Sequence, residues 1–184
     1  MNTKKKVLAI VLTIAILITT VSSAIYYVIS NSTLLSPNDS SDEVFGKSYT
    51  VSNIYDESAA YDNFTFNKDK TFKWTRSDST LSGSYALYTG NDIARLFNSE
   101  KASKGFSRDD IKNVKESVDS LVSSGAANNK DDVVYIKLTH VKTKSENGEV
   151  ESFDDIVLFG TKTNSGYSLE YMATREYYSF VEKI

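Results

Sequence analysis

The sequence predicts a mainly β domain of about eight antiparallel strands, closed into a barrel or a strongly curled sheet, with one inserted amphipathic helix and an N-terminal transmembrane helix. Residues 7–29 are apolar and uncharged, most segments after residue 44 alternate with a period of two, and residues 91–125 change to helical spacing. The strands are rich in aromatic residues, which supply the bulk that fills a barrel of this size.

The apolar segment at residues 7–29 predicts an anchor that spans the membrane. It has 23 residues, thirteen of them Val, Leu or Ile. As a helix it reaches about 34 Å, slightly more than the ~30 Å hydrocarbon core of a bilayer. Three lysines precede it, so the bias of basic residues places residues 1–6 in the cytoplasm and the rest of the chain outside the cell. The alternative is a signal peptide cleaved after Ala24, which would release a secreted domain.

A short polar stretch separates this anchor from the folded part of the chain. Residues 30–43 contain the only proline and are too polar to bury themselves, which predicts a flexible linker. Residues 44–184 are then the extracytoplasmic domain, a length that suits one hydrophobic core. The exported part carries 18 basic and 24 acidic residues without a basic stripe, so nucleic acid is not an expected partner. The chain has no cysteine, so burial rather than disulfide bonds must stabilise the domain.

Four strands are expected in the first half of this domain, over residues 47–55, 61–66, 71–75 and 83–89. The second and third are joined by a four-residue polar loop, a length typical of a β-hairpin. Each of these two strands carries aromatic residues spaced two apart, so four aromatic side chains share one face of the hairpin: Phe64, Phe66, Phe72 and Trp74. In the fourth strand, the inward positions are expected to be Tyr85 and Leu87.

The pattern changes to helical spacing after the fourth strand. Residues 92–97 can form a short helix, and residues 107–125 predict a long one with apolar residues at intervals of three and four: Ile111, Val114, Val118, Leu121 and Val122. Ser107 is placed to cap its N-terminus, and Gly125 supplies the left-handed stop at its C-terminus. On the opposite face Lys112 precedes Glu116 by four residues, which is typical of a solvated helix surface.

The period of two returns in the last third of the chain, with strands expected over residues 133–141, 152–162, 166–173 and 176–182. The first two of these strands are joined by a turn at residues 145–149. The side chains expected to face the core follow the alternation: Val134, Ile136, Leu138, Ile156, Leu158, Tyr167, Leu169, Tyr171, Tyr178 and Phe180. Four strands, a helical insertion and four more strands predict a meander closed into a barrel or curled sheet, with the helix over an open end or side.

Two phrases resemble small bacterial lipocalin-like (calycin-type) domains. Residues 61–74, followed by the Gly-x-Tyr strand within residues 81–87, are similar to the second-to-fourth-strand region of such domains, and residues 45–49 resemble the opening of their first strand. The resemblance implies a barrel that can enclose a ligand. Two features depart from it, because Lys70 stands where glycine is usual and the helix lies in mid-chain rather than after the last strand. The anchor and inserted helix also resemble exported, membrane-anchored proteins of Gram-positive bacteria.

Few residues offer catalytic or metal chemistry. His140 is the only histidine and is expected near a strand end, on the same parity as Ile136 and Leu138, where a rim or partly buried position is simpler than a ligand or acid-base role. The chain has no serine-hydrolase, zinc-protease or phosphate-loop motif, so no catalytic residue, metal or cofactor is expected. Three carboxylate pairs lack the spacing of a calcium loop and are expected at a helix start or in solvated turns: Asp109-Asp110, Asp131-Asp132 and Asp154-Asp155.

The expected function is that of a non-enzymatic, membrane-tethered binding or interaction module of lipocalin-like type. A ligand cavity in the barrel would be lined by six aromatic residues: Phe64, Phe66, Phe72, Trp74, Tyr85 and Tyr171. An eight-stranded barrel can be filled by such side chains or can hold one small ligand, so the expected partner besides the bilayer is an apolar small molecule or an envelope protein. Alternatives are an accessory subunit of an envelope complex and an envelope enzyme that uses acidic residues and His140.

Overall fold

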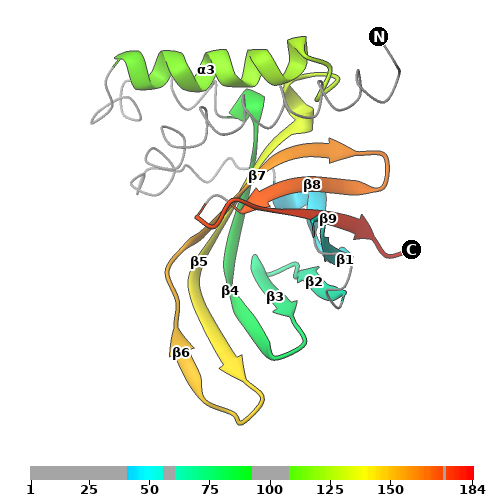
Figure 1. The fold of residues 1–184 in the computed structure, drawn as a ribbon, viewed down its shortest axis with the longest axis vertical. Coiled ribbons are helices and arrows are strands. Elements are labelled where there is room, and N and C mark those ends of the chain that lie inside the picture. The colour runs from blue at the N-terminus through cyan, green and yellow to red at the C-terminus, as the bar shows by residue number, and fades with distance from the viewer. Residues whose placement is uncertain (1–40, 56–60, 93–107, 172) are drawn as a thin grey trace.

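Antiparallel strands close into an eight-stranded barrel in the computed structural model, which describes residues 41–55, 61–92, 108–171 and 173–184 (Figure 1). The predicted mainly β fold, with antiparallel strands closed into a barrel, is confirmed. The strands are β1 (Ser48–Asn53), β2 (Asp62–Phe66), β3 (Thr71–Thr75), β4 (Ser79–Thr89), β5 (Val133–Ser145), β6 (Val150–Ser152), β7 (Ile156–Thr163), β8 (Gly166–Tyr171) and β9 (Glu176–Glu182). All except β6 form the ring, in chain order, and pairing of β1 with β9 closes it.

Three strand predictions fail because β5 is longer than expected. β5 runs to Ser145 rather than to residue 141, and β4 begins at Ser79 rather than at residue 83, because the two strands pair along this whole extension. The single strand predicted over residues 152–162 is wrong. β6 pairs with residues 142–144 of β5 and β7 pairs with residues 133–138, and exposed residues 153–155 lie between the two. The described residues therefore form nine strands instead of eight.

The inside of the barrel is the hydrophobic core, and its residues follow the predicted alternation. Nine of the ten inward positions predicted for the second half are buried core residues, and the tenth, Tyr171, packs partly buried against them. The register of strand pairing explains why the predicted inward residues are buried together. Ile136 of β5 lies opposite Leu87 of β4 and Leu158 of β7, so inward residues of neighbouring strands meet side by side.

The outer face of β5 and β7 is buried as well. Every residue from Val133 to Leu138 and from Ile156 to Gly160 is buried, including positions whose side chains point away from the core. Among these outward residues, Tyr135 stacks on Phe159 with ring centroids 4.5 Å apart. This wall of the barrel is thus packed on both faces.

Three helical elements gather where β1 and β5 begin: η1 (Ser41–Val44), α3 (Arg108–Ser123) and η2 (Lys130–Asp132). Figure 1 shows α3 lying across the top of the strands. Val118 and Leu121 are its described buried residues, and the predicted stop is confirmed, since Gly125 has φ +76° and donates from N to Val122 O at 3.1 Å. Residues 90–92 are helical, whereas the rest of the predicted short helix and the cap Ser107 lie outside the described residues.

The predicted membrane anchor, its cleavage alternative and most of the predicted linker fall in residues 1–40, which lie outside the described residues. Within the parts of the chain that the structure describes, no helix is both long and apolar enough to cross a bilayer.

Candidate functional site

The barrel has two unlike ends. Because its strands run alternately in opposite directions, the end where β1 begins also carries η1, α3, η2 and the turn at residues 67–70, and we name it the helical end. The opposite end carries the described connecting residues 54–55, 61, 76–78, 153–155 and 173–175, and we name it the loop end.

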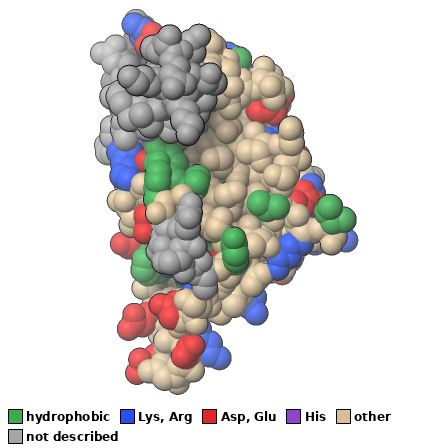
Figure 2. All heavy atoms as spheres, turned by 45° about the vertical axis from the view of Figure 1, so that its right-hand side comes forward, with side chains coloured by type: hydrophobic (Ala, Val, Ile, Leu, Met, Phe, Trp, Pro, Cys, Tyr) green, Lys and Arg blue, Asp and Glu red, His purple; other side chains and the backbone are tan. Residues whose placement is uncertain are grey.

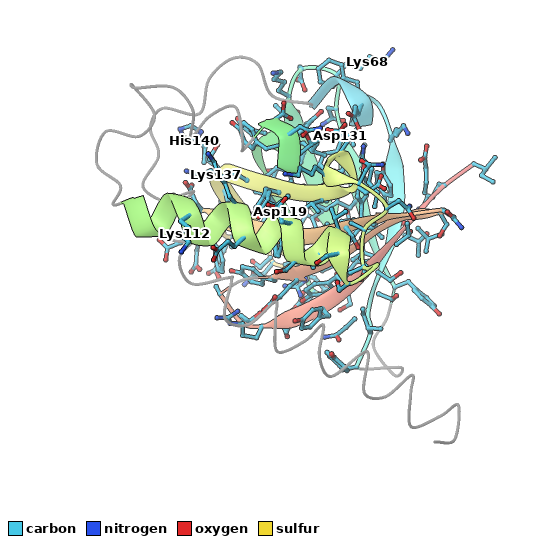
Figure 3. All side chains as sticks on the ribbon, turned by 90° about the horizontal axis from the view of Figure 1, so that it is seen from above. Lys68, Lys112, Asp119, Asp131, Lys137 and His140 are labelled. Carbon is cyan, nitrogen blue, oxygen red and sulfur yellow. The ribbon has the colours of Figure 1, made fainter. Side chains whose placement is uncertain are left out.

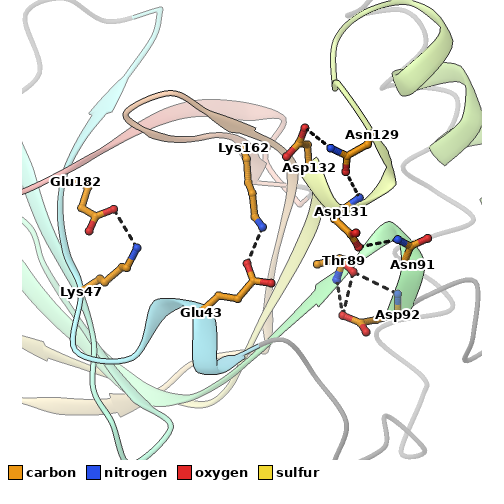
Figure 4. Close-up of polar contacts among 10 residues, drawn as sticks. All are labelled: Glu43, Lys47, Thr89, Asn91, Asp92, Asn129, Asp131, Asp132, Lys162 and Glu182. Carbon is orange, nitrogen blue, oxygen red and sulfur yellow. Dashed lines mark hydrogen bonds and ion pairs between the residues drawn. The ribbon is translucent and has the colours of Figure 1, made fainter.

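The helical end is sealed by η1. Val44 is fully buried, Phe45 packs against the core, and η1 contacts β4 on another side of the ring. Gly46 N donates to Phe66 O at 2.8 Å, which fixes η1 to the end of β2. Two ion pairs drawn in Figure 4 hold the same segment to β7 and β9: Glu43 to Lys162 at 2.6 Å and Lys47 to Glu182 at 3.2 Å. A ligand entering the barrel from this side would have to displace the buried Val44.

A connected set of polar and aromatic side chains lies at the loop end, and we name it the Trp74 cluster: Asp62, Trp74, Arg76, Glu176 and Tyr178. Trp74 Nε1 donates to Asp62 Oδ2 at 2.9 Å, and Arg76 Nε lies 3.4 Å from the same oxygen. The guanidinium carbon of Arg76 stands 5.2 Å from the Trp74 ring centroid, a cation–π geometry. The cluster therefore links the buried ring of Trp74 to the exposed guanidinium of Arg76.

Tyr178 completes this cluster from β9. Its ring meets the Trp74 ring edge-on at 5.6 Å, and its hydroxyl donates to Glu176 Oε2 at 3.0 Å. Burial, and then the hydrogen bond to Glu176, raise the pKa of Tyr178 to about 12. The hydroxyl therefore stays protonated at neutral pH and serves as a donor.

Five of the six residues predicted to line a cavity lie inside the barrel. Phe64, Phe66, Phe72, Trp74 and Tyr85 are each at most 4% exposed, and Tyr171 is partly buried beside them. Their rings pack on one another, with centroid distances of 4.6 Å for Phe64 to Phe66, 5.5 Å for Phe64 to Phe72 and 4.7 Å for Phe66 to Tyr85. These rings therefore pack against one another inside the barrel. Among them, Trp74 also contacts the polar groups of the loop end.

Exposed apolar side chains concentrate at the loop end. Of the seven large hydrophobic residues that are exposed in the described chain, five belong to its connections or to the β6 region: Ile54, Tyr55, Tyr61, Val150 and Phe153. Figure 2 shows hydrophobic side chains scattered over one face, and charged ones at the narrow lower tip.

His140 is not where the alternation predicted. Ser82 pairs with Lys142 and Ser84 with Thr139, so His140 and Val141 together oppose the single residue Gly83 in a β-bulge. His140 takes the left-handed conformation with φ +52°, and the bulge turns Val141 into the core while His140 is exposed (Figure 3). The predicted parity with Ile136 is therefore wrong, and His140 lies in the middle of β5 rather than near its end.

Three residues of the carboxylate pairs make local polar contacts in the described structure: Asp131, Asp132 and Asp155. Asp131 accepts from Asn91 Nδ2 at 2.7 Å and Asp132 from Asn129 Nδ2 at 3.2 Å, so both are tied into η2 and the end of β4 (Figure 4). Asp155 lies 3.5 Å from Lys137, and Asp154 is exposed. Asp109 and Asp110 fall in the first turn of α3. Within the described residues, no three His, Cys, Asp or Glu side chains are placed to hold a metal ion.

Sequence reasoning missed a buried carboxylate on the outside of the barrel. Glu170 is 1% exposed, and its Oε1 lies 3.0 Å from Arg175 Nη1. Its Oε2 and the hydroxyls of Tyr135 and Tyr177 are buried, without a hydrogen-bond partner in the described structure. Burial and the charge of Glu170 raise the pKa of Tyr177. The sequence did indicate that this outer face is covered. Residues 133–136 and 156–159 are apolar at every position, which is typical of strands covered on both faces.

Comparisons with known proteins found no matching family model, no matching curated protein and no matching solved structure. The closed antiparallel barrel of eight strands is consistent with the lipocalin-like fold that the sequence resembled.

Proposed function

We propose that this chain is a non-enzymatic binding module, held outside the cell by an anchor at residues 7–29, and that the loop end of its barrel is the binding surface. The observation that carries the proposal is the difference between the two ends: η1 seals the helical end, whereas the loop end combines the Trp74 cluster with exposed Ile54, Tyr55 and Tyr61.

The ligand that fits this surface is an apolar small molecule with a polar group. Its apolar part would cover Tyr55 and Tyr61, which are 71% and 73% exposed, and its polar group would reach Arg76. Arg76 suits this role because its guanidinium has five donors and its contact with Asp62 is made through Nε.

Trp74 provides the test, because it is the only tryptophan of the chain. Its fluorescence would be recorded while the exported part, residues 30–184, is titrated with 1-anilinonaphthalene-8-sulfonate and with a sixteen-carbon fatty acid. We expect a saturable change that weakens about tenfold in the double variant Tyr55→Ser with Tyr61→Ser, because the variant loses apolar contact area.

Val181→Ser is the matched control, since Val181 is also an exposed apolar residue but lies on β9 near the helical end. It should leave both titrations unchanged. A saturable response that Val181→Ser weakens as much as the double variant, or the absence of any response to either probe, would contradict a ligand site at the loop end. His140→Ala is expected to leave binding unaffected, because His140 is exposed on another part of the barrel.

A protein ligand at the same exposed side chains would make the chain an accessory subunit of an envelope complex. The exposed Tyr55 and Tyr61 favour this second candidate, because tyrosine is enriched at protein interfaces. Crosslinking in native membranes followed by mass spectrometry separates the two candidates: a reproducible crosslink from the loop end to one membrane protein supports the accessory subunit.

A further inference from the structure

Parts of β4, β5 and β6 form a three-stranded ribbon that extends past the barrel. β7 leaves β5 at Leu138, while β5 continues to Ser145 between β4 on one side and β6 on the other. Figure 1 shows this ribbon at the bottom of the molecule, with β6 along its margin. All three residues of β6 are exposed, and in the described chain no strand pairs with its outer edge.

Hydrogen bonds of the hairpin fix which backbone groups of β6 face outward. Ser145 N donates to Glu149 O at 3.0 Å, and Phe153 N donates to Val141 O at 2.8 Å. Bonding groups alternate along an antiparallel pair, so residues 149, 151 and 153 direct their N–H and C=O groups toward β5. The N–H and C=O groups of Val150 and Ser152 point the other way, where an added strand could bond to them.

The side chains along this edge are apolar and acidic. Val150 is 60% exposed and Phe153 is 49% exposed. Residues 146–155 also contain five acidic residues and no basic one: Glu146, Glu149, Glu151, Asp154 and Asp155. The edge therefore complements a strand that alternates apolar with basic residues.

A second copy of this chain fits the edge poorly. Antiparallel pairing of β6 with itself would set Glu151 opposite Glu151 or Glu149 of the other copy, depending on register. Like charges directly opposite each other destabilise a sheet. Acidic residues on a short edge strand thus disfavour self-association and leave a basic partner as the matching one.

We propose that the outer edge of β6 binds an extended segment of a partner protein, with alternating basic and apolar residues, as an additional strand. Val150 and Ser152 supply the backbone hydrogen bonds, Val150 supplies the apolar contact on one face of the ribbon, and Glu149 and Glu151 supply the charge on the other face. This surface lies on the ribbon outside the barrel ring, so the inference does not depend on what the Trp74 cluster binds.

The test uses the full chain in nanodiscs of neutral phosphatidylcholine, with a fluorescein-labelled Lys-Val-Lys-Val-Lys-Val peptide as the probe and anisotropy as the readout. We expect saturable binding that weakens with salt, and no binding of the matching Glu-Val peptide. Ser152→Pro should raise the Kd about tenfold or more, because it removes an outward N–H while taking no bond from β5. Ser152→Ala keeps that N–H and should bind as the original chain does.

Glu151→Lys gives a second measurement that does not alter the backbone, and it should weaken binding of the basic peptide about tenfold. The proposal is overturned if the Lys-Val peptide does not bind, if both proline and alanine variants bind it equally, or if Glu151→Lys has no effect. Because Trp74 fluorescence reports on the loop end separately, failure of either proposal can be recognised without the other.

Discussion

Two walls of the barrel bury their residues in different ways. Along β1, β2 and β3, buried and less buried positions alternate, so that Phe72 and Trp74 are buried while Lys73 between them is exposed. Along β5 and β7, consecutive residues are buried on both faces. The first wall has solvent on its outside, and the second is covered there.

This difference shows which buried residues a local sequence pattern can predict. A one-sided wall alternates, and its inward residues can be assigned from spacing alone. A two-sided wall is apolar at successive positions, which reveals that something covers it but not what. The alternation accordingly did not predict the burial of the outward residues Tyr135 and Phe159 of the second wall, or of Glu170 on the neighbouring strand β8.

The largest expected effect compares one outward residue from each wall. Phe159→Ala should lower the free energy of unfolding by about 3–5 kcal/mol, because it leaves a cavity beside Tyr135. Lys73→Ala, on the solvated wall, should change it by less than about 0.5 kcal/mol. Urea unfolding followed by circular dichroism measures both. Equal effects would show that the outside of β7 is not a packed surface.

A smaller loss is expected from the Arg175–Glu170 ion pair, which lies beside the covered wall on β8. Arg175→Ala removes the cation beside the buried Glu170 and should cost about 2 kcal/mol, discounted because Arg175 itself is 41% exposed. Lys47→Ala breaks the Lys47–Glu182 pair, whose members are 41% and 40% exposed, and should cost at most about 1 kcal/mol. Denaturation midpoints of the two variants decide whether Glu170 needs its partner.

Removing a buried tyrosine hydroxyl should stabilise the protein at one position and destabilise it at another. Tyr135→Phe should raise the stability by about 1 kcal/mol, because the hydroxyl it removes is buried without a hydrogen-bond partner in the described structure. Tyr85→Phe should lower it by about 1 kcal/mol, because the Tyr85 hydroxyl donates to Asn67 O at 3.1 Å. Thermal unfolding of both variants tests this, and a loss in Tyr135→Phe would mean that its hydroxyl has a partner.

The smallest effect concerns the hairpin turn of the solvated wall. Lys70 has φ +61°, so Lys70→Gly should gain about 0.5–1 kcal/mol by relieving the left-handed backbone. Lys68→Gly, in the same turn but without a positive φ, should gain nothing. A stability gain confined to Lys70→Gly, measured by urea unfolding, would explain why glycine is usual at this position in the resembling domains.

Most of the barrel could be predicted, and the failures share a cause. β3 and β9 have their predicted bounds, and the inward residues are confirmed. The split of β6 from β7 and the position of His140 could not be predicted, because both follow from the length and register of β5 against its neighbours. The six aromatic residues of the predicted cavity were placed correctly in or beside the core, and whether they bind a ligand stays a prediction.

The sequence by itself determined the class of fold, the order of the strands and the side chains that face inward, because alternation and turn residues act over a few neighbouring positions. Only the tertiary structure decided that β1 meets β9, with Tyr49 opposite Glu182, and that Glu170 is buried on the outer wall. Such features arise between strands far apart in the chain, where backbone hydrogen bonds and packing set the register and no local pattern records it.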